Sequence, residues 1–184
     1  YVSGWCGYYR AGKTAPAGRI LTFDDTNVYG FGRKPQYYRW TTPLEHQLFA
    51  ARKSPKLVTQ TGRDGRSQEV KQIEHLWNDT IPILVRSMTL AKDRLFVAGP
   101  PDFVDEEEVL KRLDQDETQE LLERQAAALQ GREGSRLLVM SVEDGRKEAE
   151  YELDTLPVWD GMAAARGNLY IAAVDGRVIC YKDN

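Results

Sequence analysis

Few residues in this sequence have the types and spacing that catalysis or metal binding requires. The chain has two histidines, His46 and His75, and two cysteines, Cys6 and Cys180. Neither histidine lies in an HExxH motif, and neither cysteine lies in a CxxC or CxxCH motif, so the common zinc, redox and haem sites have no support. A GxSxG nucleophile elbow is also missing. We therefore predict no catalytic residue and no metal site.

The two cysteines lie near opposite ends of the sequence, and two interpretations of them stay open. Cys6 and Cys180 are either independent buried thiols or the two halves of a disulfide. A disulfide requires their Cα atoms to approach within about 7 Å. That approach needs the ends of the chain to meet, as they do in a closed ring of repeats.

Three other residues are candidates for recognition. Trp159 and Asp160 stand together in LPVWDGM, where a strand is expected to enter a repeat, and Arg86 stands in PILVRSM. These three residues form the predicted channel or partner surface. Each also has a plainer alternative role: Trp159 as part of the ordinary core, and Asp160 as a turn or cap residue.

Composition narrows the class of protein. The 184 residues are 41% hydrophobic, with a formal net charge of -3 and a pI near 5.5. Basic residues are scattered among carboxylates, which excludes the positive surface typical of nucleic-acid binding. No apolar run reaches the length of about 18 residues that a membrane span needs. The length fits one domain or two small ones.

A repeated pattern of short apolar segments organises the chain. The segments Ser87–Gly99 and Gly161–Ala173 align without gaps, so that Met88 falls on Met162 and Phe96 falls on Tyr170. Ile20–Gly32 aligns with both. Each segment is an apolar run, a polar turn and a second apolar run with an aromatic residue, which is typical of a β-hairpin. Repetition of such hairpins predicts an all-β protein built from four-stranded antiparallel sheets.

Two segments interrupt this pattern. From Asp102 to Gly131, apolar residues recur roughly at helical spacing, which predicts one or two helices inserted within a repeat. The acidic run from Asp105 to Glu108 is either the start of that helix or a cation site. The segment from Pro55 to Ser67 is polar and contains glycine, and is predicted to be a loop or a long hairpin.

The motif xLYxAxxDGRVxCY, which ends at Tyr181, resembles the pyrroloquinoline-quinone-like (PQQ-like) repeat. The resemblance extends from about Gly18 to Lys182. It implies a β-propeller, and is similar to the C-terminal portion of larger propeller proteins of planctomycete-type bacteria. It also implies an extracytoplasmic location, either periplasmic or secreted. Because the chain begins with Tyr1 and not with Met, we expect a mature or clipped portion of a longer precursor.

The resemblance leaves two functions open, because one fold serves many functions. The first is a non-catalytic binding or scaffold module without a cofactor, and the alternative is a section of a quinoprotein oxidoreductase that uses PQQ and calcium. About three blades are expected in a single partial propeller domain of residues 1–184, and three blades do not close a ring. We therefore expect another polypeptide, from the rest of the same gene product or from another subunit, to complete it.

Overall fold

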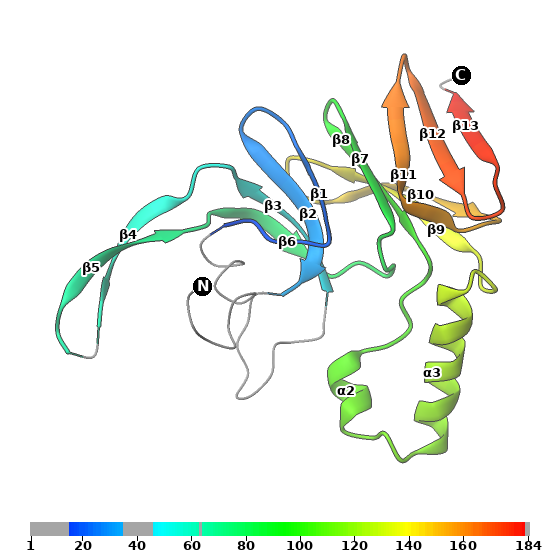
Figure 1. Ribbon diagram of the computed structural model, residues 1–184, viewed down its shortest axis with the longest axis horizontal. Helices are drawn as coiled ribbons and strands as arrows, with labels where there is room; N and C mark the ends of the chain where they lie inside the picture. The colour runs from blue at the N-terminus through cyan, green and yellow to red at the C-terminus, as the bar shows by residue number, and fades with distance from the viewer. Residues whose placement is uncertain (1–14, 35–45, 63, 183–184) are drawn as a thin grey trace. The chain divides into compact units, whose positions relative to one another are not determined.

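The structure is a computed structural model that describes residues 15–34, 46–62 and 64–182 (Figure 1). Most of its secondary structure is antiparallel β-sheet, and no sheet among these residues closes on itself. The β-rich class predicted from the sequence is confirmed. The chain divides into two compact units, Tyr1–Asp79 and Thr80–Asn184. Membership of both units in one partial propeller stays a prediction.

The first unit contains one four-stranded sheet and one long hairpin. Strands β1 (Ile20–Phe23), β2 (Asn27–Arg33), β3 (His46–Arg52) and β6 (His75–Asp79) form the sheet in the order β1-β2-β3-β6. Strands β4 (Lys56–Thr61) and β5 (Ser67–Gln72) pair only with each other and extend as a ribbon in Figure 1. Of the two structures predicted for 55–67, the long hairpin is therefore the one present.

The second unit contains two sheets and two helices. Strands β7 (Ser87–Ala91), β8 (Arg94–Gly99), β9 (Ser135–Ser141) and β10 (Lys147–Leu153) form a sheet in the order β10-β9-β8-β7. Strands β11 (Pro157–Ala165), β12 (Asn168–Ala173) and β13 (Val178–Lys182) form the other. Helices α2 (Glu106–Leu110) and α3 (Asp116–Leu129) lie between β8 and β9, inside the predicted interval of 102–131.

The start of α2 explains the acidic run in that interval. The Asp105 carboxylate accepts a hydrogen bond from the backbone N–H of Glu108 at 3.0 Å, which caps the helix. The Glu108 carboxylate in turn pairs with Lys111 at 2.6 Å and Arg112 at 3.1 Å. Those contacts fit the helix-start interpretation of the run.

The three aligned sequence segments fold into three equivalent hairpins, β1–β2, β7–β8 and β11–β12. Residues that align in the sequence occupy the same cross-strand pairs, which are Leu21 with Gly30, Met88 with Val97, and Met162 with Ile171. A register slip of one residue would exchange the two faces of a sheet. The shared register therefore means that aligned residues lie on the equivalent face of their own hairpin in each case.

Asp-Gly-Arg triplets make three of the tight turns, at Asp64–Arg66, Asp144–Arg146 and Asp175–Arg177. In each, the aspartate Oδ1 accepts a hydrogen bond from the arginine N–H, at 3.2, 3.1 and 3.1 Å. The central glycines have φ of 75°, 74° and 86°, a left-handed conformation that glycine adopts without steric cost. The same local chemistry thus ends β4, β9 and β12.

The core of the second unit lies where its two sheets stack face to face. Ala98, Leu137 and Leu153 come from the four-stranded sheet. Met162, Leu169 and Ile171 come from the three-stranded sheet, and all six side chains are at most 9% exposed. Burying one such aliphatic side chain stabilises the fold by about 1.5–3 kcal/mol. This contact holds β11–β13 on the rest of the unit.

In the first unit, a histidine packs against an aromatic side chain of the core. The His46 imidazole stacks on the Phe31 ring, with 5.3 Å between ring centroids. Burial, together with the positive charges of Arg19 and Arg33, lowers the pKa of His46 from 6.5 to about 4. His46 is therefore neutral at physiological pH and acts as a packing residue.

A first prediction concerns Gly99, which ends β8. A Cβ atom at Gly99 would lie 2.0 Å from the carbonyl oxygen of Leu84, so neighbouring backbone must move. We expect Gly99→Ala to destabilise the protein by about 3 kcal/mol, as overpacking does. The control is Gly167→Ala, where φ is +75° but nothing lies within 4 Å, so only about 1 kcal/mol is expected. Equal losses in urea denaturation would contradict the steric explanation.

A second prediction concerns pH. Because the pKa of His46 is 6.5 unfolded and about 4 folded, the unfolded chain binds more protons between these values. Stability from this group is complete above pH 6.5 and is lost as the pH falls toward 4. We expect His46→Gln to remove about 1 kcal/mol of the difference in unfolding free energy between neutral and mildly acidic solution. An unchanged pH dependence in the variant would refute this.

Candidate functional site

Strand β11 contains a bulge at the residues that the sequence singled out. Pro157 pairs with Ala173 and Met162 pairs with Ile171, so β11 holds extra residues between these pairs. Asp160 has a φ of 54°, which is uncommon for a residue with a Cβ atom. Bulges of this kind re-aim side chains and are frequent beside functional sites.

Ser87, at the start of β7, holds the bulge in place. Its side chain is fully buried, and its hydroxyl donates to the carbonyl oxygen of Val158 at 2.7 Å and accepts from the N–H of Gly161 at 2.9 Å. The N–H of Asp160 donates to the carbonyl oxygen of Arg86 at 2.8 Å. The bulge is therefore fixed on both sides by hydrogen bonds to two consecutive residues.

The bulge places Trp159 beside Arg86. The Trp159 side chain is 52% exposed, and the guanidinium carbon of Arg86 lies 5.6 Å from the centre of its ring. One guanidinium NH₂ group of Arg86 donates to the carbonyl oxygen of Leu129 at 3.0 Å. Leu129 is the last residue of α3, where a helix favours positive charge. Helix α3 thus orients the arginine that contacts the tryptophan.

One atom of this cluster has no partner among the described residues. The Nε atom of Arg86 is buried and makes no hydrogen bond. Because the guanidinium is always charged, it favours a hydrogen-bond acceptor near this edge. We define Arg86, Trp159 and Asp160 as the tryptophan site.

The structure brings together all three residues that the sequence predicted as a channel or partner surface. Whether they contact a partner stays a prediction. Asp160 is exposed and lies in the bulge with a turn-like backbone, which agrees with its plainer alternative role. Sequence reasoning missed Ser87 and Leu129. No sequence signal marked Ser87, because the residues aligned with it at that repeat position, Ile20 and Gly161, differ widely in size.

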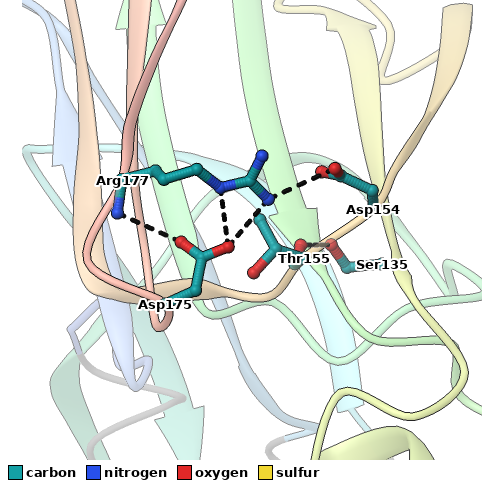
Figure 2. A network of polar contacts seen from close by, with 5 residues as sticks. All are labelled: Ser135, Asp154, Thr155, Asp175 and Arg177. Carbon is teal, nitrogen blue, oxygen red and sulfur yellow. Dashed lines mark hydrogen bonds and ion pairs between the residues drawn. The ribbon is translucent and has the colours of Figure 1, made fainter.

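A second polar cluster fixes the β12–β13 turn (Figure 2). The Arg177 guanidinium donates to Asp175 at 2.7 Å and to Asp154 at 3.2 Å, and its hydrogen bonds hold the pKa of Asp175 below the usual value. Beside it, the buried Ser135 hydroxyl donates to the carbonyl oxygen of Thr155 at 2.5 Å. Exposed ion pairs contribute about 0–1 kcal/mol. This cluster therefore orders a turn and offers no free group for chemistry.

A shallow cavity of about 190 Å³ lies where the helical segment meets β9 and β10. It is lined in part by Phe103, Arg124, Glu133 and Arg136. Arg124 lies 3.8 Å from the centre of the Phe103 ring and pairs with Glu133 at 3.5 Å. Ligand pockets usually enclose about 300–1,000 Å³. This cavity is smaller, and its arginine is already engaged.

Within 15–34, 46–62 and 64–182, no three His, Cys, Asp or Glu side chains gather closely enough to hold a metal ion. Cys180 is exposed on β13, so it is not a buried thiol. Cys6 lies outside the described residues, so its pairing with Cys180 stays a prediction. In the described part of the chain, no helix has the length and apolar character of a membrane span.

Comparison of the sequence with known proteins finds no relative. The sequence matches no protein-family model, and no curated protein matches it. What the described residues define is therefore a class of architecture, a repeat of antiparallel sheets with one helical insertion. Membership in the PQQ-like repeat family and a planctomycete-type origin stay predictions.

A third prediction tests the role of Ser87. We expect Ser87→Ala to destabilise the second unit by about 2 kcal/mol, because the buried groups of Val158 and Gly161 lose their partner. Amide exchange at Gly161 should become faster. The control is Ser67→Ala, whose hydroxyl contacts Thr61 at 3.0 Å in an exposed position, and here a change within about 0.5 kcal/mol is expected. Unchanged exchange at Gly161 would mean that Ser87 does not hold the bulge.

Proposed function

We propose that this protein is a non-catalytic interaction module of the β-propeller type that binds a partner protein through the tryptophan site. The observation that carries this proposal is the half-exposed Trp159 ring, held beside Arg86 on a bulge that a buried serine fixes. Tryptophan and arginine are the residues that most often dominate binding energy at interfaces. A side chain that is fixed before binding loses little entropy when the partner arrives.

The proposed propeller organisation is supported by the sheets of both units. The three equivalent hairpins share one register, and in the second unit one sheet stacks on the next through aliphatic side chains. Face-to-face stacking of repeated four-stranded sheets is how propeller blades pack. The proposal includes a further polypeptide that completes the ring, and an extracytoplasmic location.

Helix α3 sets the position of the arginine in the proposed site. The Leu129 carbonyl oxygen at its end holds the Arg86 guanidinium, so the insertion sets the geometry of a residue outside it. The Arg86 guanidinium lies over the Trp159 ring, and the exposed Asp160 follows Trp159 in the bulge. A half-exposed indole beside a positive charge suits a peptide segment that offers an apolar side chain. Protein is therefore the proposed class of partner.

A fourth prediction tests this function. The native particle is isolated and weighed before and after denaturation, and any companion polypeptide is rebound to variants of the chain. We expect Trp159→Ala to weaken that binding by about 30-fold or more, as loss of a hot-spot residue does. The matched control is Tyr151→Ala, an aromatic side chain on β10 that is 54% exposed, with no change expected.

Two outcomes would contradict the proposal. Equal binding by the Trp159→Ala and Tyr151→Ala variants would remove the tryptophan site from the interface. Release of calcium or of a molecule with the mass of a quinone would instead support a section of a quinoprotein oxidoreductase, and the scaffold proposal would fail.

A further inference from the structure

The outward face of the β11–β12–β13 sheet carries mainly apolar side chains, with Asn168 and Lys182 at one end, and it is half-buried to exposed in the described part of the chain. Along β12, Leu169 and Ile171 are buried against the neighbouring sheet, so the alternate residues Tyr170 and Ala172 point to the other face. Cross-strand pairing adds Ala163, Cys180 and Val178 to that outward face. Val178 is 69% exposed. We call these five residues the outer face.

The repeat indicates what belongs on the outer face. Ala98 and Ala172 occupy the same position in the aligned segments. Ala98 pairs with Leu137, and Ala172 pairs with Val178, so Val178 is the equivalent of Leu137. Leu137 is only 3% exposed, because the next sheet covers it. By the same pairing, Cys180 is equivalent to Val139, which is 6% exposed. The outer face therefore repeats positions that are buried by sheet stacking one repeat earlier.

The chain also carries an uncovered copy of the complementary face. Where the two sheets of the second unit stack, Met162 of the β11–β12–β13 sheet is one of the residues that cover the β10-β9-β8-β7 sheet. Its equivalent in the first unit is Leu21, which is 46% exposed, and Phe23 on the same side of β1 is 66% exposed. We call Leu21 and Phe23 the leading face. Both halves of the stacking contact thus exist in one sequence, each with exposed apolar side chains.

We propose that a second copy of this chain places its leading face on the outer face of the first, head to tail. Contacts between two different faces form a ring when the rotation closes. Each copy supplies three repeated sheets in its described residues, so two copies supply six, within the usual four to eight blades of a propeller. This inference rests on the propeller organisation proposed above but does not involve the tryptophan site.

A fifth prediction follows for the full chain in solution. We expect a dimer by sedimentation equilibrium at micromolar concentration. Val178→Glu and Leu21→Glu should each raise the dimer dissociation constant by about 100-fold or more, since each buries a charge in the contact. The control is Leu57→Glu on the β4–β5 hairpin, where the side chain is 63% exposed and no change is expected. Far-UV circular dichroism and urea denaturation verify that each variant folds.

Three results would overturn the inference. A wild-type chain that stays monomeric at tens of micromolar excludes the second copy. A dimer that is lost with Val178→Glu but retained with Leu21→Glu means that two outer faces contact each other. A stable particle of one copy with a different polypeptide, lost with Val178→Glu, means that another chain covers the face. Partner binding that still depends on Trp159 would leave the proposed function standing in each case.

Discussion

The need to cover the apolar face of each sheet is the constraint on which the second unit depends. In a strand that alternates its side chains, one face is stabilised only if another sheet lies on it. The stacking of Met162, Leu169 and Ile171 on the neighbouring sheet meets this need for one face. It also fixes the register of β11 and β12, because a slip of one residue would turn these side chains to solvent.

The geometry of the tryptophan site depends on the same contact between sheets. Ser87 occupies the first position of β7, where the two sheets meet, and its hydroxyl bonds to two backbone groups of β11. A buried hydroxyl must find partners, and the bulge supplies them at the cost of an unusual backbone at Asp160. Recognition and packing are therefore coupled, because the serine that joins the sheets also positions the exposed indole.

Local features of the fold were predictable from the sequence. Alternating apolar residues and polar turns identified the hairpins of Ile20–Gly32, Ser87–Gly99 and Gly161–Ala173, and helical spacing identified the insertion. Trp159, Asp160 and Arg86 lie together in the structure, and their role as a channel or partner surface stays a prediction. Their geometry was not predictable, because the contact between Arg86 and the end of α3 joins residues far apart in the sequence. The pairing of β4 with β5 stayed ambiguous for a related reason, since a polar segment carries little periodic signal.

The insertion between β8 and β9 shows that the connection between these two strands of the repeat can vary in length. At the equivalent place, β12 and β13 are joined by only four residues, Val174 to Arg177, whereas β8 and β9 are joined by a segment with two helices. Lengthening a loop costs little, only about 0.6 kcal/mol for each doubling of its length. Strand pairing on either side is the same in both sheets. The end of the hairpin is thus a position at which this repeat accommodates connections of very different length while the strand pairing stays the same.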